Sequence, residues 1–210
     1  MINQSLAVCD VSGSMLQSSG RVSPLYAATG LTLFLQHVSN PPWNRHVITF
    51  SESPHLIEVS LEEQLYNQVR KILTLDAGFN TDFNKVIDLI MNYGKEKKIP
   101  NDQMPKVLFI FSDMEFDDAF TGETNFETLK RQYADSGYSL PLVIFWNLKG
   151  GKTSRSTPVL SSQEGVFLLS GYSAQTLNFF FTNEDLKQLT PLVMLNGIIE
   201  DPRYKCITVC

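Results

Sequence analysis

The sequence predicts an α/β domain with a doubly wound, mainly parallel central sheet, one antiparallel edge strand, and helices on both faces. Short runs that are apolar throughout recur along the chain, as is typical of strands buried on both faces of a parallel sheet. Segments with apolar residues at helical spacing lie between these runs, so strands and helices alternate. The length of 210 residues and a hydrophobic content of 43% suit a single domain with a sizeable core.

In the first half of the chain, apolar runs predict strands over residues 6–9, 46–50 and 55–59. The second and third of these form a hairpin, which places the third strand at the antiparallel edge. Ser23 and Pro24 are typical of a helix start, and Asn40-Pro41-Pro42 ends that helix. A further amphipathic helix is expected over 61–73, with Leu65 on its inner face.

In the second half, residues 106–111 are apolar after Lys106 and form the best strand candidate in the sequence, which predicts a central strand. Further strands are expected over 142–146 and 166–169. The helices expected here are one from Phe83 that closes at Tyr93-Gly94, one over 126–133, and closing helices over 176–181 and 183–199.

Composition excludes several classes of partner. The net charge is −5 and the sequence has no basic stripe, which argues against nucleic acid. No run is long enough to span a bilayer.

Three cysteines without metal-binding spacing predict an intracellular, cytoplasmic protein. The first strand begins within a few residues of Met1, so we expect no signal peptide and a domain cut from a longer protein.

The first strand leads directly into the sequence Asp10-Val11-Ser12-Gly13-Ser14. Open α/β sheets place their ligands at the carboxyl ends of strands, which is where Asp10 is expected. One carboxylate and two hydroxyls then share one tight loop, with Gly13 expected to let the backbone turn. Hard cations such as Mg²⁺ prefer oxygen ligands of this kind. The motif is short enough to occur by chance, so the rest of the sequence must decide whether it marks a metal site.

Two other polar loops, residues 78–82 and 112–118, supply that context. In a doubly wound sheet all three loops can meet at the crevice where the strand order reverses. The oxygen ligands that they would pool are Asp10, Ser12, Ser14, Thr81 and Asp113. Two carboxylates just neutralise a divalent ion, which could then accept a further anionic ligand from outside.

This set of loops resembles the von Willebrand factor A domain with its metal-ion-dependent adhesion site, on a Rossmann-like fold. The match to D-x-S-x-S is complete, and Thr81 and Asp113 stand where the family has its threonine and aspartate. The resemblance implies that the serines bind the metal directly and the aspartates largely through water. It also implies that the threonine's contact changes between open and closed states. Glu115 could accept a hydrogen bond from metal-bound water.

A more specific resemblance is to the C-terminal domain of a plant and viral family related to the Ro (TROVE) ribonucleoproteins. It rests on the segments CDVSGSM, VITFS, GFNTDF, FIFSDMEFDDA, VIFWNL and GYS. Residues 1–210 are therefore expected to form one von Willebrand A-like domain, the C-terminal part of a longer protein. The helical-repeat RNA-binding ring of the Ro proteins has no counterpart in these residues, so the resemblance implies no direct nucleic acid binding.

The sequence departs from the commonest A-domain pattern in two loops. Phe79 and Asn80 stand between Gly78 and Thr81, where two glycines usually precede the threonine. Met114 occupies the place of a glycine after the third-loop aspartate. Phe79 and Met114 are thus expected to form the rim that a partner contacts.

The function expected from these features is divalent-cation-dependent protein binding, in which a partner's Asp or Glu completes the metal shell. Mg²⁺ is the expected ion, with Mn²⁺ or Ca²⁺ as alternatives. A second reading is a structural domain of a larger ribonucleoprotein-like protein without a metal-mediated partner. A third, a magnesium-dependent phosphatase, needs a second acid two residues after Asp10, where Ser12 stands. A serine hydrolase would need a histidine presented to Ser12 or Ser14, and neither serine has a histidine nearby in the sequence. We therefore expect that the chain is not an enzyme.

Overall fold

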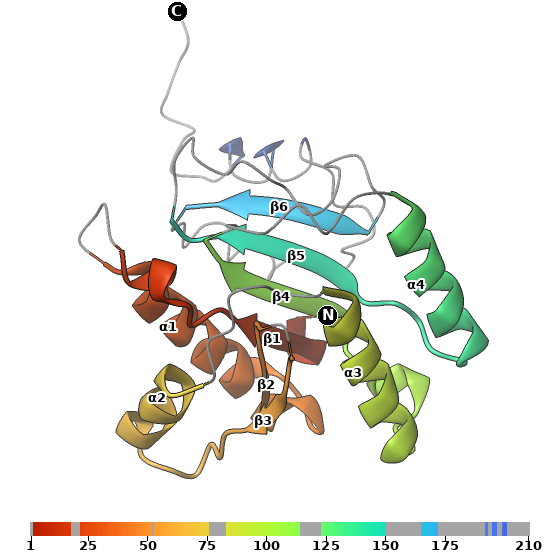
Figure 1. The fold of residues 1–210 in the computed structure, drawn as a ribbon, viewed down its shortest axis with the longest axis horizontal. Coiled ribbons are helices and arrows are strands. Elements are labelled where there is room, and N and C mark those ends of the chain that lie inside the picture. The colour runs from red at the N-terminus through yellow and green to blue at the C-terminus, as the bar shows by residue number, and fades with distance from the viewer. Residues whose placement is uncertain are drawn as a thin grey trace, which may run out of the picture.

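The computed structural model describes residues 2–17, 22–51, 53–75, 83–113, 123–149 and 165–171, with positions 192, 195, 196, 199 and 200. Six strands within these residues form one sheet in the order β3-β2-β1-β4-β5-β6 (Figure 1). Their bounds are Ser5–Cys9 for β1, His46–Thr49 for β2, Leu56–Glu58 for β3, Val107–Ser112 for β4, Leu142–Asn147 for β5 and Val166–Ser170 for β6.

The strand pairings confirm the predicted fold class. Every neighbouring pair is parallel except β2 and β3, which form the expected antiparallel edge. The chain runs outward from β1 to β3 and then returns to place β4 on the other side of β1. Strand order therefore reverses between β1 and β4, the position at which doubly wound sheets bind ligands. Both strands are buried along their whole length, as their uninterrupted apolar character predicts.

Helices cover both faces of the sheet, with α1 and α2 on one side and α3 and α4 on the other (Figure 1). The α-helices with described bounds are α1 (Pro24–Val38), α2 (Leu65–Leu73), α3 (Phe83–Glu96) and α4 (Glu123–Asp135). The short 3₁₀ turns in the described part of the chain are η1 (Ile2–Gln4), η2 (Gly13–Leu16), η3 (Trp43–Arg45) and η4 (Asn101–Gln103). Successive strand residues point to opposite faces, so Ala7 and Cys9 pack toward α1 and α2, and Leu6 and Val8 toward α3 and α4.

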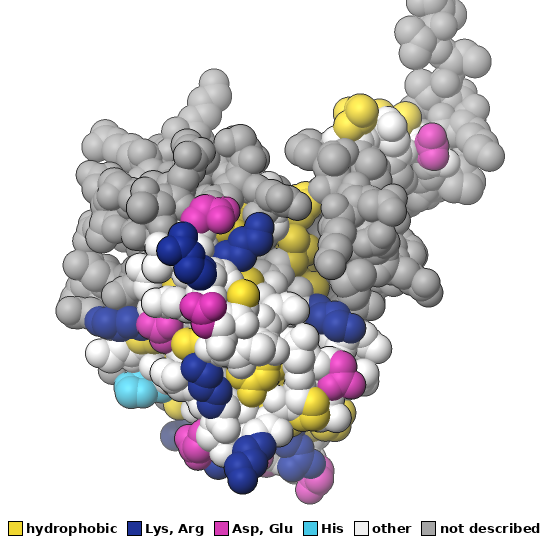
Figure 2. Space-filling model, turned by 90° about the vertical axis from the view of Figure 1, so that its right-hand side faces the viewer, with side chains coloured by type: hydrophobic (Ala, Val, Ile, Leu, Met, Phe, Trp, Pro, Cys, Tyr) yellow, Lys and Arg dark blue, Asp and Glu magenta, His cyan; other side chains and the backbone are white. Residues whose placement is uncertain are grey.

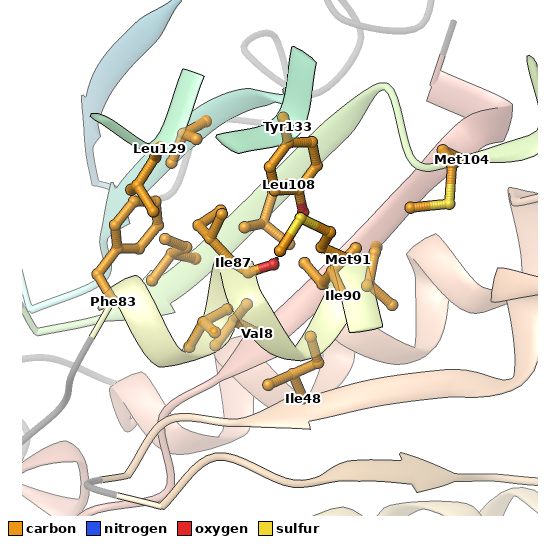
Figure 3. Close-up of a cluster of buried hydrophobic side chains, with 14 of the residues drawn as sticks. Val8, Ile48, Phe83, Ile87, Ile90, Met91, Met104, Leu108, Leu129 and Tyr133 are labelled. Atoms are coloured by element: carbon orange, nitrogen blue, oxygen red, sulfur yellow. The ribbon is translucent and has the colours of Figure 1, made fainter. Parts of the chain in front are cut away.

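The core between the sheet and α3 is shown in Figure 3. Ile87 and Ile90 of α3 are fully buried and pack in one cluster with Leu108 of β4. Tyr133 of α4 adds a polar contact, because its hydroxyl donates a hydrogen bond of 2.9 Å to the backbone carbonyl of Ile87. This packing holds both helices against the strands whose carboxyl ends carry the candidate site.

Two helix predictions need correction. Helix α2 begins at Leu65 rather than at residue 61. The Gln68 side chain donates a hydrogen bond to the carbonyl of Glu63 at 2.7 Å, which holds the preceding turn outside the helix. Leu65 is 62% exposed and does not lie on the inner face. Helix α3 does not close at Gly94 but continues to Glu96, and Lys98 takes the positive φ after it.

The surface over α3 and α4 carries positive and negative side chains interspersed, without a patch of one sign on the part of that face that the structure describes (Figure 2). Among the described helices, none is long and apolar enough to cross a membrane. The predicted closing helices over 176–181 and 183–199 fall outside the described residues apart from four isolated helical positions.

Candidate metal site

The loop after β1 is fixed by the buried side chain of Met15, which has no solvent exposure. The backbone N–H of Met15 donates to the carbonyl of Ser12 at 3.1 Å, closing the short turn η2. The hydroxyl of Ser23, just before α1, donates to the carbonyl of Met15 at 2.8 Å. The start of α1 therefore ties down the loop that presents Asp10, Ser12 and Ser14.

Asp10 lies at the carboxyl end of β1 with only 5% of its surface exposed. Its Oδ1 accepts a hydrogen bond of 2.9 Å from the backbone N–H of Ser12. Its Oδ2 accepts one of 2.7 Å from the hydroxyl of Ser112, the last residue of β4. The Asp10 backbone N–H donates to the carbonyl of Phe111 at 3.0 Å. Contacts from both central strands thus hold this carboxylate in one orientation.

Asp113 follows β4 directly and is also buried, with 4% of its surface exposed. Burial raises the pKa of Asp10 above its ordinary value of 3.8, and the charge of Asp113 raises it further. Hydrogen bonds from Ser12 and Ser112 act in the opposite direction, because they favour the ionised form. The structure therefore brings together the two carboxylates that the sequence predicted to meet.

The hydroxyl oxygens of Ser12 and Ser14 lie 3.0 Å apart, and both side chains are half-buried. This separation can be tested against Mg²⁺, which takes octahedral oxygen ligands at about 2.0–2.1 Å, so that neighbouring ligands lie about 3 Å apart. The two hydroxyls satisfy that spacing without rearrangement. Together with Asp10 and Asp113 they form a donor set that fits a hard divalent cation.

Lys149 is a residue of the site that sequence reasoning missed. Its ammonium Nζ lies 3.5 Å from Oδ2 of Asp113. It follows β5 closely, at the same carboxyl edge of the sheet as Asp10 and Asp113. The available signal was its place as the first charged residue after a predicted strand.

Four predicted residues of the site lie outside the described residues: Thr81, Phe79, Met114 and Glu115. The proposed role of Gly13 needs correction. An added Cβ at this position would meet no atom within 4 Å, and its φ is not in the left-handed region. The turn therefore does not require glycine at position 13.

The described residues hold no group of three or more His, Cys, Asp or Glu side chains that could bind a metal. The candidate site instead combines two carboxylates with neutral hydroxyls. Such a set matches the preference of Mg²⁺ and similar hard ions rather than that of zinc, which favours nitrogen and sulfur ligands.

Comparison with known families matches residues 4–197 to a family described as Domain of unknown function (DUF7788). The chain belongs to the DUF7788 family. A relative of this DUF7788 chain, the uncharacterized protein L728 of Acanthamoeba polyphaga mimivirus, is 32% identical over 203 residues. That match covers 94% of the chain but 33% of L728, so the chain spans about a third of that relative's length.

The solved structures that resemble the DUF7788 chain include the following two. The Ro (RSR) protein of Deinococcus radiodurans matches with a TM-score of 0.56 and 20% identity, over 81% of this chain and 32% of that protein. The SpRpn10 VWA domain matches with a TM-score of 0.50 and 14% identity, over 89% of this chain and 97% of that domain. These likenesses establish a von Willebrand A-like fold for the DUF7788 chain.

Proposed function

We propose that this chain is a divalent-cation-dependent protein-binding module. One observation supports this proposal above the others. Two buried carboxylates, Asp10 and Asp113, and two hydroxyls 3.0 Å apart, Ser12 and Ser14, meet where the strand order of the sheet reverses. Burying two like charges side by side is costly unless a cation neutralises them, so the site is suited to binding one.

In this proposal the hydroxyls of Ser12 and Ser14 hold the ion directly, while Asp10 and Asp113 act largely through water. Thr81 would supply a further hydroxyl from the second loop. Mg²⁺ is the proposed ion, with Mn²⁺ or Ca²⁺ as alternatives. A bound divalent cation would supply a Lewis-acid position for an Asp or Glu side chain of a protein partner. Ser112 contributes by orienting Asp10 through its 2.7 Å hydrogen bond.

Exposed apolar side chains next to the site support a protein partner. Leu16, two residues after Ser14, is 58% exposed, and Tyr26 in the first turn of α1 is 59% exposed. The backbone of Tyr26 is joined to the loop through Ser23, which bonds both elements. We propose that these side chains, with the predicted rim residues Phe79 and Met114, contact the partner around its carboxylate.

We propose no catalytic role for the site. Ser12 stands where a phosphatase of the haloacid dehalogenase type requires its second acid. The competing function is a structural domain in a larger protein, without a metal-mediated partner. The likeness to the Ro (RSR) protein and the ion pair between Lys149 and Asp113 favour this alternative, because an ammonium can compensate a buried carboxylate without metal.

Partner capture with and without metal separates the two functions. The immobilised 210-residue chain would be exposed to cell extract in Mg²⁺ and in chelator, beside its Asp113→Ala and Asp102→Ala variants. Asp102 is exposed on η4, away from the site, and serves as the matched control. Adhesion predicts capture that requires Mg²⁺ and is lost only in Asp113→Ala. Capture that is unchanged both by the chelator and by the Asp113→Ala substitution would reject cation-dependent protein binding.

A further inference from the structure

Lys149 is held in place by its backbone. Its N–H donates to Oδ1 of Asn147 at 3.0 Å, and the N–H of the preceding residue, Leu148, donates to the carbonyl of Ser112 at 2.9 Å. Leu148 is fully buried. The base of the Lys149 side chain is therefore fixed against β4, directly beside the residue that precedes Asp113.

The ammonium lies within the candidate metal site rather than on open surface. Its Nζ is 3.5 Å from Oδ2 of Asp113, whose side chain is 2% exposed, while the Lys149 side chain is 21% exposed. One positive charge thus faces a site that holds two buried carboxylates. Opposite charges at this separation attract strongly when water is largely excluded.

A divalent cation bound by the same carboxylates would lie only a few ångströms from this ammonium. Like charges so close in a partly buried site repel each other by the same Coulomb law. The ammonium and the metal therefore compete for the negative charge of Asp113. Because the Lys149 side chain is partly exposed and flexible, its head can move into water while its backbone stays fixed.

We propose that Lys149 is a tethered counter-ion of the metal site: its ammonium neutralises Asp113 while no metal is bound and is displaced when a divalent cation binds. This inference rests on the proposed function, because it takes Asp113 to be part of a metal site. Because the Lys149 ammonium must be displaced, the affinity of the chain for a cation is lower than the oxygen ligands alone would give. The site is then filled only where the cation, or the cation together with a partner carboxylate, outcompetes the lysine.

The test compares metal affinity in three forms of the 210-residue chain: wild type, Lys149→Gln and Lys106→Gln. Lys106 is exposed and precedes β4 at the opposite end of the strand. Both substitutions change the net charge equally, so the control separates a local effect from a global one. Binding of Mg²⁺ and Mn²⁺ is measured by calorimetry. Lys149→Gln is expected to bind at least about tenfold more tightly than the other two.

Three other outcomes are distinguishable. Equal affinity in all three forms, or weaker binding by Lys149→Gln, overturns the counter-ion role and leaves the metal site standing. Absence of binding in both wild type and Lys149→Gln overturns the proposed function, and this inference with it. Binding by Lys149→Gln alone supports the inference, because the lysine then masks a working site.

A stability measurement in chelator provides a second readout. Lys149→Gln leaves the Asp113 carboxylate buried without its ammonium partner, so its melting temperature should fall below that of wild type. The double variant Lys149→Gln/Asp113→Asn should recover, since the Asp113 charge that the ammonium neutralised is then absent as well. Adding Mg²⁺ should raise the melting temperature of Lys149→Gln more than that of wild type. An equal rise in both proteins would contradict displacement of the lysine.

Discussion

Ser112 donates a hydrogen bond of 2.7 Å from its hydroxyl to Oδ2 of Asp10, although 102 residues separate them in the sequence. The parallel register of β1 and β4 brings the two residues together. Cys9 pairs with Phe111, and Asp10 and Ser112 are the residues that follow this pair along the chain. One central strand thus orients the carboxylate that the other presents.

Replacing Ser112 with alanine should lower the free energy of unfolding by about 1.5–3 kcal/mol, the range for a hydrogen bond to a charged group. Urea denaturation at neutral pH in chelator measures the change. The same substitution in an Asp10→Asn background should cost less, since the bond is then between neutral groups. An equal cost in both backgrounds would show that Ser112 acts through packing and not through this bond.

Asp10→Asn should make the metal-free protein more stable. Burial raises the pKa of Asp10 above its ordinary value, which means that the fold disfavours the charged form. An amide keeps the acceptor for the Ser12 N–H, and the Ser112 hydroxyl can accept from its NH₂ group. A melting temperature a few degrees above wild type in chelator is expected, at about 2–4 °C per kcal/mol. A lower melting temperature would mean that the charge stabilises the fold.

Stability should fall in mildly acidic solution because of His46. Burial lowers the pKa of this imidazole below 6.5, although its hydrogen bond to the Pro42 carbonyl acts in the opposite direction. The unfolded chain therefore binds the proton at a higher pH than the folded one, and stability is lost as the pH falls below about 6.5. Urea denaturation at about pH 7.5 and about pH 5.5 measures this loss. In His46→Gln the loss should be smaller; an identical loss would exclude His46 as its source.

Cys9 should not react with alkylating reagents in the folded protein. Its side chain has no solvent exposure, and burial raises the pKa of the thiol to about 12. The reactive thiolate is therefore scarce at neutral pH. Mass spectrometry after iodoacetamide treatment should find Cys9 unmodified in buffer and modified in denaturant. Rapid labelling in buffer would show that β1 opens readily.

Much of the fold could be predicted because the local pattern and the tertiary environment agree. The run 106–111 is apolar after Lys106, and residues 107–111 lie in β4, a central strand buried on both faces. The antiparallel edge was predicted from a short turn between two apolar runs and was confirmed as β3. The start of α2 was missed because the Gln68 side chain bonds the preceding turn, a contact that apolar spacing does not record.

Among the described residues of the candidate site, the sequence predicted only those in loops that directly follow a recognisable strand. Asp10 and Asp113 each follow an apolar run, so their meeting could be expected from the topology. Ser112 was visible as a hydroxyl at a strand end, but its bond to Asp10 depends on the strand register. Lys149 is the first charged residue after the predicted strand 142–146, but its contact with Asp113 depends on the pairing of β5 with β4, which the linear sequence does not show.

Titration calorimetry of Mg²⁺ into wild type and Asp10→Asn in parallel tests whether Asp10 belongs to a metal site. Wild type is expected to bind the ion saturably, and Asp10→Asn is expected not to bind it although that variant is folded and at least as stable. Equal binding by the two proteins would place the ion elsewhere. Absence of binding by wild type and Lys149→Gln alike would contradict the metal site itself.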